Sequence, residues 1–191
     1  MVNVAVVCEG KNDRGFFETL IPHLQFDIGQ ASFYMLGGKS NLFDEHNKRY
    51  EDLKYEFNND QIQKVLFVVD ADDVKNDVVY GGYENTQASL TAVIDKLGFN
   101  QVAETYIMCD PVTQIGYLES LLLSTISGEQ KQCIESFLQC SQFKAKDHHK
   151  VILNDIYKLA YPNAPYDFSH SHFDELKEVL TRLFSQNITS L

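Results

Sequence analysis

Acidic side chains follow two apolar segments of the sequence at the points where those segments end. Glu9 comes directly after the run VNVAVVC, and Asp70 and Asp72 come directly after KVLFVV. Asp13 lies four residues beyond Glu9, which is one turn into the helix that the following sequence predicts. Ligand sites of open parallel sheets lie at the carboxyl ends of the strands. We therefore expect these four carboxylates to converge on one edge of a sheet.

Carboxylates that converge in this way repel one another and favour a bound cation. A site made only of oxygen ligands suits a hard ion such as Mg²⁺ or Mn²⁺. Asp70 and Asp72 are two residues apart, so in extended backbone they point the same way and can share the ion. A purely structural interpretation stays open, because aspartate also follows strands where it begins a turn or caps the next helix.

A second candidate feature is the turn Gly37-Gly38-Lys39-Ser40. It is similar to the end of a phosphate-binding P-loop, but that motif requires glycine at position 33, where this chain has Phe33. The turn can still present backbone N–H groups and the Lys39 ammonium close to the same edge. Gly38 and Lys39 are therefore predicted to bind a phosphate group.

The surrounding sequence predicts the elements that position these residues. Short apolar runs predict strands at 2–8, 31–36, 64–69 and 102–108. Helical spacing predicts helices from about residue 13, at 40–57 with Ser40 as its cap, and at 84–97 with Gly98 as its C-cap. Beyond Pro111 only helices are predicted, at 115–126, 129–140, 146–160 and 172–185.

Strands and helices that alternate predict an α/β fold with a mainly parallel four-stranded sheet flanked by helices. The helices that follow predict a C-terminal all-helical extension. We expect an α/β domain over 1–125 and an extension over 126–191 that docks on it to form one compact unit.

Composition limits the functional classes. The 191 residues include 16 Lys and Arg against 27 Asp and Glu, a net charge of -11. This charge disfavours indiscriminate coating of nucleic acid, although a nucleic-acid enzyme can take its positive charge from metal ions. No apolar run is long enough for a membrane span, the N-terminus lacks the pattern of a signal peptide, and no cysteines form a C-x-x-C pair. A cytoplasmic protein with four reduced thiols and no membrane partner is expected.

Two motifs in this order resemble the toprim domain. The first is a strand followed by Glu9-Gly10-Lys11-Asn12-Asp13 and a helix, and the second is a strand followed by Asp70-Ala71-Asp72-Asp73. Topoisomerases, primases, OLD-family nucleases and recombination-type repair proteins share this domain, and the likeness is greatest to small stand-alone bacterial toprim-like proteins. The resemblance covers about residues 1–125.

The resemblance implies that Glu9 acts as a general acid/base or a metal ligand and that Asp70 and Asp72 bind Mg²⁺. Asp13 corresponds to an acidic residue of the OLD-like branch, and Glu119 to a glutamate that contributes there to a second metal site. Glu119 also has a structural interpretation, because a carboxylate in the first turn of a helix complements the helix dipole.

OLD-like nucleases use a lysine from a later helix to stabilise the charged transition state, and Lys146 or Lys150 is the candidate here. The sequence thus favours Mg²⁺-dependent phosphoryl transfer on the phosphodiesters of DNA or RNA. Two alternatives stay open. One is a non-catalytic toprim-like module that binds a partner protein in a repair or defence complex, and the other is a metal-dependent phosphatase or nucleotide-binding protein.

Overall fold

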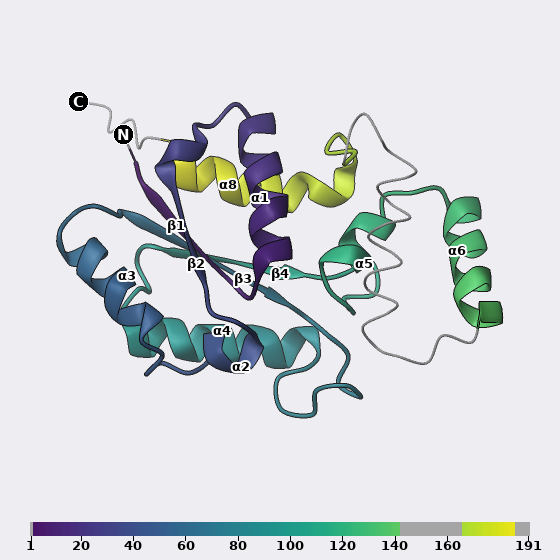
Figure 1. The fold of residues 1–191 in the computed structure, drawn as a ribbon, viewed down its shortest axis with the longest axis horizontal. Coiled ribbons are helices and arrows are strands. Elements are labelled where there is room, and N and C mark those ends of the chain that lie inside the picture. The colour runs from purple at the N-terminus through teal and green to yellow at the C-terminus, as the bar shows by residue number, and fades with distance from the viewer. Residues whose placement is uncertain (1, 142–165, 186–191) are drawn as a thin grey trace.

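The computed structural model describes residues 2–141 and 166–185. Its centre is a four-stranded sheet with β1 (Val4–Cys8), β2 (Ala31–Met35), β3 (Lys64–Asp70) and β4 (Ala103–Met108). The strands lie in the order β2-β1-β3-β4 and every pair is parallel, as Figure 1 shows. The predicted α/β fold is confirmed, and the sheet is wholly rather than mainly parallel.

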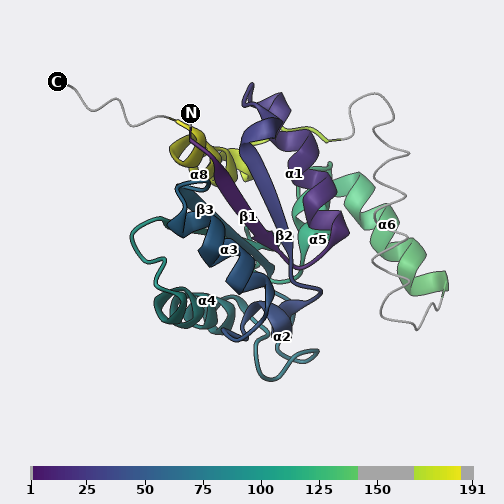
Figure 2. The same ribbon diagram turned by 60° about the vertical axis from the view of Figure 1, so that its left-hand side comes forward.

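Helices cover both faces of this sheet (Figure 2). One face packs against α1 (Lys11–His23), α5 (Leu118–Leu123) and α8 (Asp174–Phe184). The other face packs against α2 (Lys39–Leu42), α3 (Arg49–Asn58) and α4 (Tyr83–Leu97). The helix α6 (Gly128–Ser141) and the short 3-10 helices Ile28–Gln30 and Ser171–Phe173 complete the described elements.

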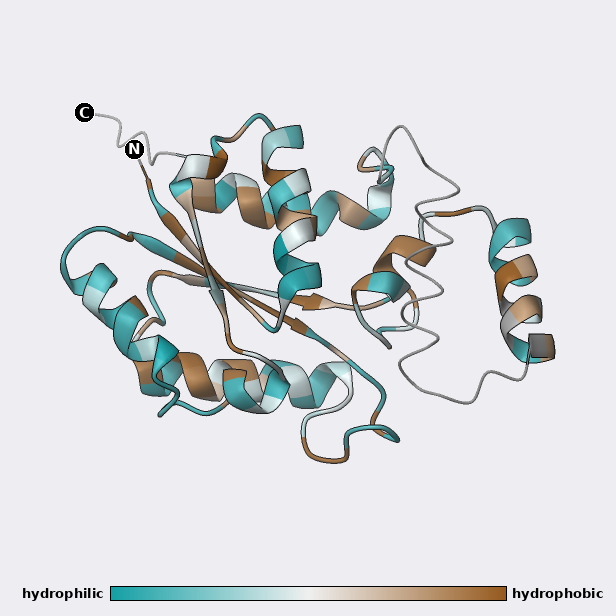
Figure 3. Ribbon diagram, viewed as in Figure 1, coloured by the Kyte–Doolittle hydropathy of each residue, from teal (hydrophilic) through white to brown (hydrophobic). Residues whose placement is uncertain are grey.

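Burial on both faces explains why the two central strands, β1 and β3, are continuous apolar runs in the sequence. Val4, Val6 and Cys8 of β1 pack on the side of α1 and α8, whereas Ala5 and Val7 pack on the side of α3 and α4. Figure 3 shows the resulting hydrophobic band along the strands. Parallel strands require this pattern, because their crossover helices cover both faces.

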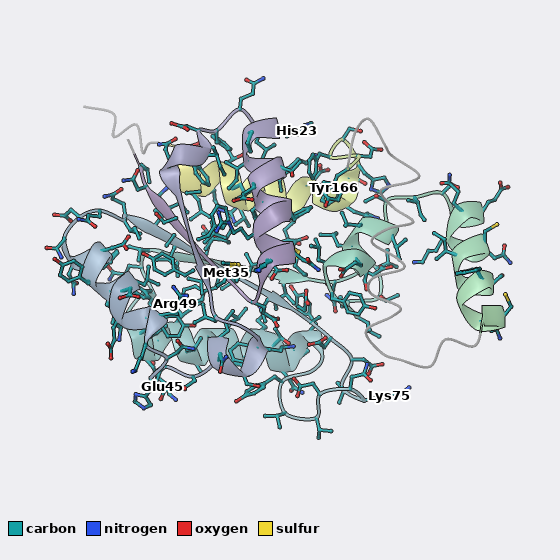
Figure 4. The ribbon with its side chains drawn as sticks, in the orientation of Figure 1. His23, Met35, Glu45, Arg49, Lys75 and Tyr166 are labelled. Atoms are coloured by element: carbon teal, nitrogen blue, oxygen red, sulfur yellow. The ribbon has the colours of Figure 1, made fainter. Side chains whose placement is uncertain are left out.

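The C-terminal helix α8 is docked on the sheet and shares a hydrophobic core with α1. Its amphipathic sequence buries Leu176, Leu180 and Leu183 against β3 and β4. The chain that leads into it crosses α1, where the ring of Tyr166 meets the ring of Phe16 with centroids 5.4 Å apart. Figure 4 shows Tyr166 in the segment that leads into α8. In the described ranges, no helix has the length and apolar character to cross a membrane.

Two predicted helices are shorter in the structure. The segment predicted as one helix over 40–57 forms α2 and α3, because Asp44 and Asn47 accept backbone N–H bonds at 3.1 and 3.0 Å and hold a turn between them. Ser40 lies inside α2 rather than at its cap.

The segment 115–126 is helical only from Leu118, and the predicted helix 146–160 lies outside the described residues. Gly98 is a left-handed C-cap with φ of 81°, as predicted.

Candidate metal centre

The carboxyl ends of all four parallel strands lie at one edge of the sheet. The crossover connections that leave this edge run in opposite directions from β1 and from β3. From β1 the chain crosses to β2 on one side, and from β3 it crosses to β4 on the other side. The gap between the ends of β1 and β3 is thus the topological switch point, where open α/β sheets bind their ligands. Glu9 directly follows β1 and Asp70 is the last residue of β3. Neighbouring strands thus bring both carboxylates to the switch point.

Glu9 and Asp70 contact each other across this gap. The Asp70 backbone N–H donates to Glu9 Oε1 at 3.0 Å. The Asp70 side chain is 7% exposed, and its Oδ1 accepts a hydrogen bond from the Leu118 backbone N–H at 3.1 Å. Because Leu118 is the first residue of α5, this bond joins the edge of the sheet to the N-terminus of that helix. The two carboxylates are thus oriented by backbone N–H groups rather than by solvent.

Loss of hydration, together with the neighbouring carboxylates, changes the protonation of Glu9. Burial and the neighbouring charge of Asp70 raise the pKa of Glu9 from 4.5 to about 7, although the hydrogen bond from the Asp70 N–H opposes the rise. The charges of Asp13 and Asp72 raise that pKa further. The charges of Asp13, Asp70 and Asp72 therefore all act on Glu9.

Asp13 and Glu119 are both buried close to this edge. Asp13 is 8% exposed, and its Oδ2 accepts a hydrogen bond from the Gly10 backbone N–H at 2.9 Å. It therefore caps the first turn of α1, as the structural interpretation expects. Glu119 is 1% exposed in the first turn of α5, directly after the residue that donates to Asp70. Its burial on α5 places it on the same side of the sheet as α1.

Asp72 is not in extended backbone, so the geometric reason for expecting it to point the same way as Asp70 does not hold, and their sharing of one ion stays a prediction. Asp72 has φ of 59°, which is left-handed rather than extended backbone. Its N–H donates to the Gly116 carbonyl at 2.6 Å, and the two residues form an antiparallel bridge. Its Oδ2 lies 3.3 Å from Lys39 Nζ. The bridge to Gly116 therefore fixes the backbone of Asp72, and its carboxylate contacts Lys39.

Lys39 is buried, although lysine rarely is. Its Nζ donates to the Ala71 carbonyl at 3.0 Å as well as to Asp72. Two glycines with positive φ, Gly37 at 82° and Gly38 at 136°, form the turn that brings it there. The phosphate-binding role of Gly38 and Lys39 stays a prediction, and the ammonium lies inside the turn that follows β3. Lys146 and Lys150 lie outside the described residues.

Sequence reasoning missed Asp110 and Lys131. Asp110 follows β4 as Glu9 follows β1, so the same rule of carboxylates after strands could have found it. Its Oδ2 lies 3.0 Å from Lys131 Nζ of α6. Burial alone would raise the pKa of Asp110, but the Lys131 hydrogen bond and two backbone N–H groups hold it below its usual value. Both residues line a cleft of about 420 Å³ that also reaches Asp72.

Residues 3–185 match a family described as "Protein of unknown function (DUF3226)". The chain belongs to this family. The match covers the whole sheet, the loops that carry the four carboxylates, and α8. Neither a curated protein nor a solved structure matches the chain. The relationship to toprim domains therefore stays a prediction.

The side chains at the carboxyl edge of the sheet determine whether a divalent ion could bind there. Among the described residues, no group of three or more His, Cys, Asp or Glu side chains is placed to hold a metal ion. Mg²⁺ does not need such a group, because it is usually bound by one or two carboxylates and completes its shell with water and substrate phosphates. Glu9 and Asp70 supply two carboxylates whose repulsion a cation would relieve. The residues fit Mg²⁺ or Mn²⁺ in this mode.

Proposed function

We propose that this protein catalyses Mg²⁺-dependent phosphoryl transfer on nucleic-acid phosphodiesters, with Glu9 and Asp70 as the centre of the site. The observation that carries the proposal is the direct contact of these two residues at the topological switch point. A position that commonly binds ligands thus holds the half-buried carboxylate of Glu9 and the buried carboxylate of Asp70, which repel each other. A divalent ion would relieve the repulsion between the two carboxylates and could also bind a phosphate group at this position.

Each side chain has a task in this proposal. Asp70 and Glu9 hold the ion, and the N–H groups of Leu118 and Asp70 keep the two carboxylates in orientation. When bound, the ion polarises a phosphate and lowers the pKa of a coordinated water. In the absence of the ion, Glu9 exchanges its proton near neutral pH, the range in which a carboxyl group works best as a general acid or base.

The cleft beside the edge is the proposed path of the substrate. It is lined by polar and apolar residues of the loops after β3 and β4, by residues of α5 and by Lys131 of α6. The phosphodiester class itself rests on the resemblance to toprim nucleases. Since the chain carries a net charge of -11, the bound ion and the few lysines of this region would supply the attraction for phosphate.

A second candidate function is a non-catalytic module that binds a partner protein. It is favoured by the contacts that α5 and Lys39 make with Asp70 and Asp72, because such contacts satisfy carboxylates without any metal. This candidate predicts that Mg²⁺ leaves the stability of the protein unchanged. Phosphoryl transfer predicts that Mg²⁺ stabilises it, since the ion binds only the folded chain.

The test is cleavage of labelled DNA and RNA in Mg²⁺ or Mn²⁺ by the wild-type protein and by Asp70→Asn. The substitution removes the charge and retains an acceptor for the Leu118 N–H, so we expect the fold to survive and cleavage to fall at least 100-fold, on the order of 3 kcal/mol of transition-state stabilisation. Asp95→Asn is the matched control, because Asp95 is exposed near the end of α4, at the opposite edge of the sheet. Full activity of Asp70→Asn would contradict the proposal.

A further inference from the structure

We propose that Lys39 is a built-in cation that takes the place of a second metal ion, so that the centre holds a single divalent ion at Glu9 and Asp70. Asp72 is then the residue that positions Lys39 and is not a metal ligand. This inference rests on the metal centre proposed above. It differs from the expectation that Asp70 and Asp72 share one ion.

The contacts of the ammonium group are the first support. Lys39 Nζ lies 3.3 Å from Asp72 Oδ2 and 3.0 Å from the Ala71 carbonyl oxygen. The Lys39 side chain is 6% exposed, against 27% for that of Asp72. An ammonium buried to this extent is stable only where a charge and further acceptors compensate for its lost hydration. The Lys39 ammonium is therefore held at the turn formed by Asp70, Ala71 and Asp72.

The backbone around Lys39 is built to place it there. The Gly37 N–H donates to the Glu9 carbonyl at 2.9 Å, so the turn after β2 is attached to the residue that follows β1. Gly38, with φ of 136°, then directs the chain into α2, where Lys39 is the first residue. The ammonium thus lies between the two loops that carry the proposed metal ligands.

The backbone of Asp72 sets its carboxylate toward Lys39 rather than toward an ion. Its left-handed conformation is held by hydrogen bonds in both directions with Gly116, at 2.6 and 3.3 Å. A second divalent ion at Asp72 would lie beside the buried Lys39 ammonium, and the two positive charges would repel each other. One cation is thus already supplied by the chain, and phosphoryl transfer needs its positive charge at fixed positions.

Counting bound Mn²⁺ by electron paramagnetic resonance tests this inference without any assay of activity. The wild-type protein is expected to bind one ion. Lys39→Met releases the Asp72 carboxylate and is expected to bind two. The double variant Lys39→Met/Asp72→Asn is expected to return to one, and Lys39→Arg, which keeps the charge, to remain at one.

Asp72→Asn provides a second test if Lys39→Met fails to fold. This single variant is expected to retain its one ion, whereas Asp70→Asn loses it. Two ions in the wild type, one ion in Lys39→Met, or loss of the ion in Asp72→Asn would each overturn the role of Lys39 and leave the metal centre standing. No Mn²⁺ binding to the wild type at millimolar concentration would overturn the metal centre and this inference with it.

Discussion

At the scale of single residues, Glu9 carries the clearest electrostatic consequence of the fold. Its carboxyl group is half-buried, and loss of hydration together with the charges of Asp70, Asp13 and Asp72 raises its pKa to about 7. Between the ordinary value of 4.5 and this raised value, the folded chain binds a proton that the unfolded chain has lost. The free energy of unfolding of the metal-free protein must therefore decrease as the pH rises through this interval, and level off above it.

Glu9→Gln tests this linkage, because the amide oxygen can still accept the Asp70 N–H while the charge is removed. In EDTA at pH 8 we expect the variant to be more stable than the wild type by about 1–3 kcal/mol. The difference should shrink as the pH falls toward 4.5. Urea unfolding followed by circular dichroism at several pH values measures it. Equal stability of the two proteins at pH 8 would show that Glu9 is not under this repulsion.

The sequence predicted which residues gather at the edge but not the direction in which each side chain points. Glu9 and Asp70 could be placed because parallel strands end at a common edge. Asp72 could not, because its direction depends on a bridge to Gly116, which is distant in sequence. The Asp70–Leu118 hydrogen bond spans 48 positions in the chain, and no local pattern encodes such a contact.

At the scale of elements, the loop between β4 and α5 is the part that sequence periodicity described least well. Apolar spacing predicted a helix from residue 115, but Asp110 bridges to Ile115 and Asp72 bridges to Gly116. These two bridges hold the chain in a tight loop, and α5 begins only at Leu118. The central strands β1 and β3 were predictable because burial on both faces leaves a continuous apolar run, which a short loop does not.

Gly116→Ala tests whether this loop depends on its glycine. Gly116 has φ of 105°, and an added Cβ would lie 2.1 Å from Ser120 Oγ. We expect a loss of about 2 kcal/mol or more in the free energy of unfolding, from backbone strain together with the clash. The matched control is Gly15→Ala in α1, where an added Cβ meets no atom within 4 Å. This control should gain about 0.5–1 kcal/mol from helix propensity. Equal effects of the two changes would contradict the account of the loop.

At the scale of the whole molecule, the two ends of the described chain share one hydrophobic core. β1 and α1 pack with α8 on the same face of the sheet, and His23 of α1 contacts Phe168 with ring centroids 4.9 Å apart. Figure 4 shows His23 at the end of α1 that lies near the segment leading into α8. We expect α8 to unfold together with the sheet rather than as a separate unit.

Leu180→Ala tests this cooperativity. Leu180 is fully buried in α8, so its truncation should cost about 2–5 kcal/mol and shift a single unfolding transition. Glu178→Ala is the control, because Glu178 is exposed on the same helix and should change stability by less than about 0.5 kcal/mol. Tyrosine fluorescence and circular dichroism are expected to report the same midpoint. A separate early transition for α8 would contradict a shared core.

The central claim is that Glu9 and Asp70 form a metal centre, and a crystal structure in Mn²⁺ with anomalous diffraction tests it most directly. We expect one anomalous peak per chain, in contact with the carboxylates of Glu9 and Asp70. The Asp72 carboxylate is expected to keep its ion pair with Lys39. A peak at another position, or no peak at millimolar Mn²⁺, would contradict the claim.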